Sequence, residues 1–272
     1  IYMIKQAIIP LAGLGTRLLP LTSVFAKELL PINGKPGLEY IIEECIEAGI
    51  KEIVFIISKK KLMIKKYFYN DKFYKDIIKK KNDPKIIKEY KKILKYKKMI
   101  KFVFQDKPLG TGDAVYKTKK FITDKYFLML LPDDLIIKKN CSKSMIAVHN
   151  KFKASVMASM KVNKNDVSRW GIYNIRKKID KNNFIINNVV EKPSIKTSPS
   201  NNAVIGRYIL PKTIFSKLKS LKPGKSGEFH ITDAIQALIE DDNQFIGHNF
   251  SGKYLDCGTM KGYIKSTLEI SK

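Results

Sequence analysis

Two glycines and two positively charged residues near the start of the chain are spaced as a phosphate-binding loop requires. The segment Leu11–Pro31 reads LAGLGTRLLPLTSVFAKELLP. Gly13 and Gly15 lack the Cβ atoms that would hold a ligand away, and their N–H groups can point at phosphate oxygens. Arg17 and Lys27 add two fixed positive charges to the same loop. We therefore expect this segment to bind a phosphorylated ligand.

The loop differs from the two common phosphate-binding motifs. The sequence has no Gly-x-x-x-x-Gly-Lys-Ser/Thr string, and the dinucleotide fingerprint needs a third glycine where Leu18 stands. A bare Gly-x-Gly at the end of a strand is more typical of an ordinary turn. The longer pattern is more specific: Gly-x-Gly-Thr-Arg-x-x-Pro-x-Thr, followed by Lys-Glu-x-x-Pro. The prediction of phosphate chemistry therefore depends on the whole string.

A carboxylate follows another apolar segment. Phe127–Leu131 reads FLMLL, a predicted buried strand, and is followed by Pro132-Asp133-Asp134. Carboxylates at the carboxyl ends of parallel strands lie where open α/β sheets bind ligands. Pro-Asp-Asp also forms ordinary turns. In a chain that already carries a phosphate-binding loop, we favour Asp133 as a ligand of Mg²⁺, which prefers hard oxygen donors.

The elements that must position these residues alternate between strands and helices. Ile4–Pro10 and Glu52–Ile57 are predicted strands, and Leu38–Ala48 between them has apolar residues at helical spacing and ends at Gly49. A strand–helix–strand unit implies a parallel sheet with a right-handed crossover. We predict an α/β fold with a Rossmann-like, twisted, mainly parallel sheet flanked by helices.

The charge of the chain constrains its partners. The sequence has 52 lysines and arginines against 25 acidic residues, a net charge of +27. A protein that grips nucleic acid is expected to use arginine for bidentate contacts. Only four of the basic residues are arginines: Arg17, Arg169, Arg176 and Arg207. We attribute the lysine excess to AT-rich codons, read the lysine-rich segment 59–101 as solvated amphipathic helices, and expect no nucleic-acid partner.

Other features of composition indicate a cytoplasmic protein. No apolar run of 18 residues occurs, and no charged-then-apolar leader precedes the first predicted strand, so we expect no membrane contact. Cys45, Cys141 and Cys257 are odd in number and widely spaced. They predict neither a disulfide framework nor a metal cluster.

The motifs, taken in order along the chain, resemble those of one enzyme family. After the opening loop come Gln105 with the glycine loop at 110–112, the segment Val189-Val190-Glu191-Lys192-Pro193, and Asp256-Cys257-Gly258-Thr259. This series resembles the sugar nucleotidyltransferases, and most closely the bacterial UTP:glucose-1-phosphate uridylyltransferases (UDP-glucose pyrophosphorylases). The resemblance covers Gln6–Tyr263 and is poor only in the lysine-rich segment. It implies a single GT-A-like nucleotidyltransferase domain, with a nucleotide-binding half at 1–134 and a sugar-binding half at 135–272.

The resemblance implies a reaction as well as a fold. An oxygen of glucose-1-phosphate would attack the α-phosphorus of UTP in line, releasing pyrophosphate and forming UDP-glucose, with Mg²⁺ as the cofactor. Such a transfer needs alignment and charge neutralisation and no covalent intermediate. The family also implies a homo-oligomer.

The resemblance further assigns roles to single residues. Arg17 would hold the leaving pyrophosphate, and Lys27 and Lys192 would flank the reacting centre. Asp133 and Asp256 would hold Mg²⁺. The nucleotide-binding residues would be Leu11, Ala12, Gly13, Gly15, Gln105 at the uracil edge, and Gly110. The sugar-binding residues would be Gly171, Glu191 and Gly206. Adjacent residues on an extended strand point to opposite faces, so Glu191 and Lys192 serve one substrate only if a bulge or turn redirects one of them.

Departures from the family pattern leave alternatives open. Ser23, Ala26 and His230 stand where relatives carry lysine, proline and glutamine, and Trp170 replaces a tyrosine. An inactive regulatory or binding homologue is therefore one alternative. A glucose-1-phosphate thymidylyltransferase is the nearest enzymatic alternative, because uracil and thymine differ by one methyl group. A nucleic-acid-binding protein ranks last.

Overall fold

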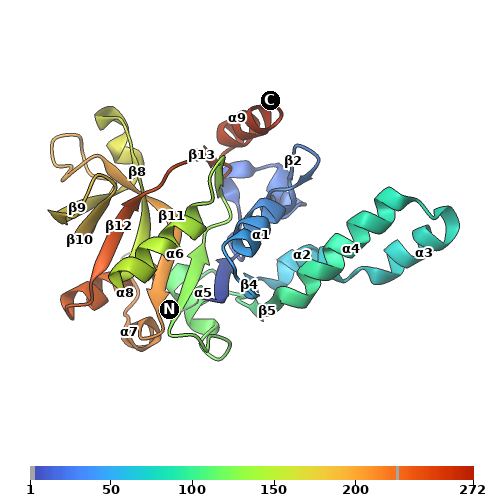
Figure 1. Cartoon of the computed structure of the whole chain (residues 1–272), viewed down its shortest axis with the longest axis horizontal. Helices are drawn as coiled ribbons and strands as arrows, with labels where there is room; N and C mark the ends of the chain where they lie inside the picture. The colour runs from blue at the N-terminus through green and yellow to red at the C-terminus, as the bar shows by residue number, and fades with distance from the viewer. Residues whose placement is uncertain (1–3, 225–226) are drawn as a thin grey trace.

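A nine-stranded sheet runs through the body of the molecule (Figure 1), whose computed structural model describes residues 4–224 and 227–272. The strand order is β5-β4-β1-β6-β11-β8-β12-β10-β9. The strands are β1 (Gln6–Pro10), β4 (Glu52–Ile57), β5 (Ile100–Phe104), β6 (Tyr126–Leu130), β8 (Ser155–Lys161), β9 (Gly171–Lys178), β10 (Asn183–Glu191), β11 (Asn202–Pro211) and β12 (Phe245–Asn249). Two small antiparallel sheets pair β13 (Lys253–Asp256) with β7 (Asp134–Ile137), and β2 (Pro31–Ile32) with β3 (Lys35–Pro36).

The predicted parallel sheet is found in the first half of the chain. Strands β5, β4, β1 and β6 are all parallel, and β1, the following helix and β4 form the expected crossover unit. The second half is mixed, because β11 pairs antiparallel with β6 and β8, and β10 pairs antiparallel with β9 and β12. Among the described strands of that half, β8 and β12 alone pair in the parallel direction. Strands joined by a tight connection, as β9 and β10 are, can pair only in the antiparallel direction.

Helices cover both faces of the sheet, because its buried strands are apolar on both sides. In β1, Ala7 and Ile9 belong to one core cluster and Ile8 to the other. The first cluster includes residues of α1 (Gly37–Glu47), α2 (Leu62–Tyr69), α4 (Pro84–Met99) and α6 (Cys141–Phe152). The second includes residues of α5 (Thr111–Lys117), α7 (Ile214–Ser220) and α8 (Ile231–Glu240). The last helix, α9 (Met260–Ile270), follows β13.

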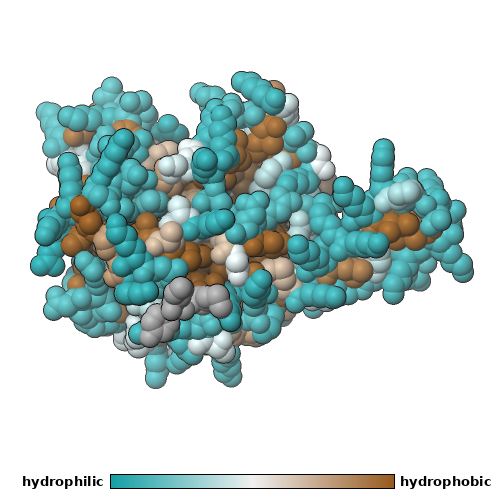
Figure 2. Space-filling model, in the orientation of Figure 1, coloured by the Kyte–Doolittle hydropathy of each residue, from teal (hydrophilic) through white to brown (hydrophobic). Residues whose placement is uncertain are grey.

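The lysine-rich segment is helical, as expected, and forms α2, α3 (Asp71–Lys81) and α4. Helix α3 and the adjoining end of α4 project away from the sheet as an arm (Figure 1). Ile93 and Tyr96 anchor the base of α4 in the core, whereas α3 has no buried residue. Figure 2 shows a hydrophilic surface along the arm with an apolar strip within it, as expected for solvated lysines over a thin apolar contact. None of the helices in the described residues is long and apolar enough to cross a bilayer.

Candidate active site

The loops that carry the predicted phosphate and metal residues meet at one edge of the sheet. Because β1, β5 and β6 are parallel, their carboxyl ends lie together, where open α/β sheets bind ligands. A cavity of about 670 Å³ opens there. It is lined by residues of the loop after β1 (Ala12, Gly13, Gly15, Arg17, Lys27, Glu28), the loop after β5 (Gln105, Gly110), the loop after β6 (Asp133, Asp134) and the later segments (Arg169, Trp170, His230, Tyr254, Asp256, Thr259), among others.

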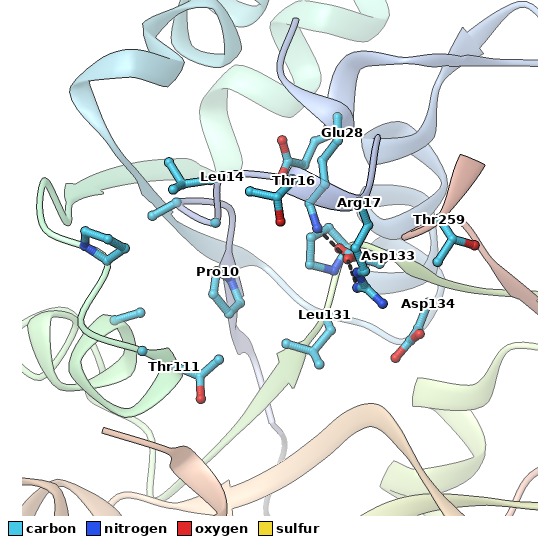
Figure 3. A pocket seen from close by; sticks show the side chains of 18 of the residues that line it. Pro10, Leu14, Thr16, Arg17, Glu28, Thr111, Leu131, Asp133, Asp134 and Thr259 are labelled. Atoms are coloured by element: carbon cyan, nitrogen blue, oxygen red, sulfur yellow. Dashed lines mark hydrogen bonds and ion pairs between the residues drawn. The ribbon is translucent and has the colours of Figure 1, made fainter. Parts of the chain in front are cut away.

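Two cations converge on one carboxylate in this cavity. The ammonium of Lys27 donates a hydrogen bond to Oδ2 of Asp133, and Nη2 of Arg17 lies 3.6 Å from the same oxygen (Figure 3). The side chains of Lys27 and Asp133 are 15% and 18% exposed, whereas that of Arg17 is 66% exposed. Two positive charges against one negative charge leave the cluster attractive to phosphate groups, and its partly buried setting limits screening by salt.

The two glycines of the first loop, Gly13 and Gly15, differ in whether the fold requires a glycine at their position. Gly15 has φ +71°, in the left-handed region that favours glycine, and its carbonyl accepts hydrogen bonds from the Leu18 N–H (2.9 Å) and the Thr22 hydroxyl (2.8 Å). At Gly13, a Cβ atom would meet no other atom within 4 Å. The fold therefore does not require a glycine at position 13, and the open space beside it is available to a ligand.

Ala26 and Ser23, the two departures in this loop, are accommodated locally. Ala26 has φ −63°, close to the value that a proline ring would impose, so its backbone already has the conformation of a proline at this position. Its N–H, which a proline would lack, points at the sulfur of Met63 at 3.1 Å. The Ser23 hydroxyl donates to the Pro20 carbonyl at 2.6 Å. Both residues thus make contacts that suit the observed conformation of the loop.

The two predicted metal ligands are neighbours. The N–H of Cys257 donates to the carbonyl of Asp133 at 2.8 Å, which brings the residue after Asp256 against the turn that carries Asp133. Asp256 accepts a hydrogen bond from the Gly258 N–H at 2.8 Å. Both ion pairs of Asp133 use Oδ2.

Their donor set fits Mg²⁺ bound partly by a substrate. Within the described residues, no three or more His, Cys, Asp or Glu side chains gather as a complete metal cage. Mg²⁺ is commonly held by one or two carboxylates together with substrate phosphates and water. The two-carboxylate arrangement matches that mode.

Asp134, next to the predicted metal ligand, has a structural role that its sequence position did not reveal. Its carboxylate accepts hydrogen bonds from the Tyr254 hydroxyl (2.7 Å) and from the Gly206 N–H (2.8 Å). Burial raises the pKa of Asp134 above its ordinary value, although these hydrogen bonds act in the opposite direction. A Cβ on Gly206 would lie 2.5 Å from Asp134 Oδ2 and from the Leu131 Cβ. Gly206 is thus explained by close protein packing and does not require a bound sugar.

Gln105 lines the cavity, and the nitrogen of its side-chain amide is already hydrogen-bonded within the protein. Its amide nitrogen donates to the Gly110 carbonyl (3.0 Å) and to Asp113 (2.7 Å), so its carbonyl oxygen is the end that can accept a hydrogen bond from a ligand. Gly110 also lines the cavity, with φ +95°. A Cβ on Gly110 would lie 2.5 Å from the Phe229 carbonyl oxygen. This contact requires a glycine whether or not a base is bound.

The predicted sugar residues lie beside the cavity. Gly171 pairs with Glu191 across β9 and β10, and a Cβ at Gly171 would lie 3.0 Å from the Glu191 carboxylate. Lys192 has φ +45° and donates its N–H to the Trp170 carbonyl at 2.9 Å. This left-handed residue provides the expected turn between Glu191 and Lys192. Among the described residues, Leu11 and four of the predicted sugar-half residues are not part of the cavity lining: Gly171, Glu191, Lys192 and Gly206.

A buried ion pair that sequence reasoning missed supports the turn carrying Asp133. Arg207 is fully buried, and its guanidinium donates to both carboxylate oxygens of Glu44. It also donates to the carbonyls of Leu131 (3.1 Å) and Asp134 (2.6 Å), on either side of Asp133. The available signal was Glu44 itself, since an acidic residue near the apolar face of a helix needs a partner.

Known proteins resemble the chain over almost its full length. The family model described as nucleotidyl transferase matches residues 6–272. The UTP–glucose-1-phosphate uridylyltransferase 2 of Staphylococcus saprophyticus is 37% identical over 267 residues, which cover 98% of this chain and 91% of that protein. A crystal structure of UDP-glucose pyrophosphorylase complexed with UDP-glucose has a TM-score of 0.86 and 33% identity, covering 99% of both chains. The UTP-bound UGPase from Acinetobacter baumannii has a TM-score of 0.88 and 31% identity, covering 98% of this chain and 93% of that one.

Proposed function

The chain belongs to the nucleotidyl transferase family, and from this premise we propose that it transfers a uridylyl group from UTP to glucose-1-phosphate, giving UDP-glucose and pyrophosphate. The observation that carries the proposal is the cluster of Arg17, Lys27 and Asp133 in a glycine-lined cavity. The full-length similarity to uridylyltransferases selects the substrates.

The cluster provides the charge that phosphoryl chemistry needs. In-line displacement at the α-phosphorus requires aligned reactants and neutralised phosphate oxygens. Arg17, the more exposed of the two cations, would bind the leaving pyrophosphate, and Lys27 would lie closer to the reacting phosphorus. Lys192 would approach the sugar phosphate from the opposite half. These residues bind and orient, and none forms a covalent intermediate.

The carboxylates of Asp133 and Asp256 would hold Mg²⁺ together with the phosphates of UTP. When bound, the metal would supply charge neutralisation across the phosphates of the nucleotide. Asp133 also accepts a hydrogen bond from Lys27, so the same carboxylate would serve both the metal and the reacting cation.

The base would be read on the side of Gln105. Uracil carries an N3–H that can donate to the Gln105 carbonyl oxygen, whereas cytosine has an acceptor at the same position. This contact would favour UTP over CTP. It does not distinguish uracil from thymine, which share that edge.

The test is pyrophosphate release from glucose-1-phosphate with Mg²⁺, measured side by side with UTP, dTTP, CTP, ATP and GTP. The proposal expects UTP to give the fastest release. Faster release with dTTP would move the protein to the thymidylyltransferases. No release with any nucleotide, from folded protein, would favour an inactive binding or regulatory homologue.

We also expect a homo-oligomer. Ile264 and Leu268, one turn apart on the same face of α9, are 52% and 62% exposed, and such residues can pack against another chain. Light scattering of the purified protein tests this expectation, and a strictly monomeric mass would contradict it.

A further inference from the structure

A buried ion pair lies directly beside Lys27. The ammonium of Lys61 donates to both carboxylate oxygens of Glu28, each at 2.8 Å. The Glu28 side chain is 1% exposed and that of Lys61 is 9% exposed. Glu28 follows Lys27 in the chain and lines the cavity (Figure 3), whereas Lys61 comes from the turn that precedes α2. The pair therefore links the phosphate-binding loop to the base of the helical segment.

A second contact joins the same two segments. The N–H of Ala26, the residue before Lys27, points at the sulfur of Met63 in the first turn of α2 at 3.1 Å. Lys27 is thus held through the residues on both of its sides. Lys27 begins a single short 3₁₀ turn, Lys27–Leu29, which is closed by a hydrogen bond from the Leu30 N–H to the Lys27 carbonyl at 3.2 Å.

The burial of this pair argues for a positional role. Burial raises the pKa of Glu28 and lowers that of Lys61, whereas the opposite charge of the partner acts in the other direction on each pKa. A buried ion pair is a weak stabiliser compared with apolar residues of the same volume, but its hydrogen bonds fix a particular geometry. The geometry fixed here is that of the residue next to Lys27.

We propose that Lys61 is a positioning residue for Lys27, acting through the buried Glu28 carboxylate to hold the Lys27 ammonium at the Asp133 carboxylate. The expected change in turnover rests on the proposed function, whereas the expected change in the position of Lys27 does not. A displacement of about 1 Å at a reacting group can lower turnover by about a hundredfold. Restraint of the Lys27 backbone therefore has a direct effect on rate.

The first test needs no enzymatic activity. Lys61→Met is compared with Lys60→Met, a matched control that removes an exposed lysine of the same turn. Both proteins are treated briefly with an acetylating reagent, and modification of Lys27 is followed by mass spectrometry. Lys27 is largely buried in the native protein, so we expect its modification rate to rise about threefold or more in Lys61→Met only. Equal rates in the two variants would overturn the proposal.

The second test asks whether Lys61 acts through Lys27. Turnover is measured for Lys61→Met, Lys27→Ala and the double variant. We expect Lys61→Met to lower kcat about tenfold with little change in KM for UTP, and to have almost no further effect in the Lys27→Ala background. Effects that multiply in the double variant would mean that Lys61 supports the fold in general.

Lys61→Met leaves Glu28 buried without its partner, so this variant risks misfolding. In that case Glu28→Met/Lys61→Met replaces the pair with apolar residues of similar volume, which proteins commonly tolerate. The same acetylation and kinetic results are expected of it, and wild-type values would overturn the proposal. If the wild-type protein releases no pyrophosphate while the acetylation rates still differ, the proposed function fails and the positioning role stands.

Discussion

Lys27 and Asp133 are 106 residues apart in the chain, yet the ammonium of one donates a hydrogen bond to the carboxylate of the other. They meet because β1 and β6 are adjacent parallel strands whose following loops lie at the same edge of the sheet. This ion pair joins a residue of the phosphate-binding loop to a proposed metal ligand. It therefore sets the charge balance of the cavity before any substrate arrives.

We expect Lys27→Ala to lower kcat by about a hundredfold or more, because it removes a preorganised positive charge from the reacting phosphate. The measurement is pyrophosphate release at saturating UTP and glucose-1-phosphate. Lys35→Ala is the control, since Lys35 pairs with Glu43 and does not line the cavity. Near-normal turnover of Lys27→Ala would remove Lys27 from the mechanism.

Gly13→Ala should separate binding from folding. A Cβ at Gly13 meets open space, so we expect the free energy of unfolding to change by less than about 0.5 kcal/mol. The methyl group would occupy space proposed for the nucleotide, and KM for UTP should rise about tenfold or more. Gly15→Ala, in contrast, should lose about 1 kcal/mol of stability because Gly15 has φ +71°. An unchanged KM for UTP in Gly13→Ala would place the nucleotide elsewhere.

We expect the effect of Mg²⁺ on stability and turnover to require Asp133. UTP with Mg²⁺ is expected to raise the melting temperature of the wild-type protein, and EDTA should abolish the magnesium-dependent part of that rise. Asp133→Asn keeps the shape of the side chain but removes its charge. The magnesium-dependent rise in melting temperature should therefore be lost in this variant, and turnover should fall about a hundredfold or more. Asp106→Asn, at a surface residue paired with Lys59, is the control. A magnesium-dependent rise that survives in Asp133→Asn would rule out this ligand.

Acid should destabilise the fold partly through His149. Burial lowers the pKa of His149 below its ordinary value of 6.5, and its Nδ1 lies 2.8 Å from the Ala154 carbonyl. A histidine whose pKa is lower in the folded state takes up its proton less readily there than in the unfolded chain. Its contribution to stability is therefore complete above about pH 6.5 and is lost as the pH falls through the folded-state value.

The measurement is the melting temperature of wild type and His149→Asn from neutral to mildly acidic pH. The asparagine amide can still donate to the Ala154 carbonyl but cannot take up a proton in this range. The melting temperature of the variant should therefore fall less steeply. Equal slopes for the two proteins would show that other groups govern the acid response.

The local elements could be predicted from the sequence because their apolar periods are strong. The predicted strand Glu52–Ile57 matches β4 at both ends, and the predicted helix Leu38–Ala48 differs from α1 by one residue at each end. The mixed second half could not be predicted in this way. Pairing of β11 with β6 and β8 depends on contacts between distant segments, and no local pattern encodes strand direction.

The residues of the candidate site also divide into those that a sequence motif predicts and those that no motif predicts. Arg17, Lys27 and Asp133 are predicted from motifs at strand ends, and Gln105 and Asp256 from the family resemblance. The fold brings all five into one cavity. The buried partners that support them come from distant positions and carry no motif: Glu28 with Lys61, Glu44 with Arg207, and Asp134 with Tyr254. The glycines show a further limit. Gly13 faces open space whereas Gly110 and Gly206 face protein atoms, a difference that appears only once their neighbours are placed.

Strand β6 delivers Asp133 to the site and is hydrogen-bonded to β1 on one side and to β11 on the other. The boundary between the two halves of the chain is therefore bridged by the sheet itself. A fragment that ended at Asp134 would leave the β11 side of β6 as a bare edge, a ready template for aggregation. Separated halves would therefore each expose a strand edge that the other now covers.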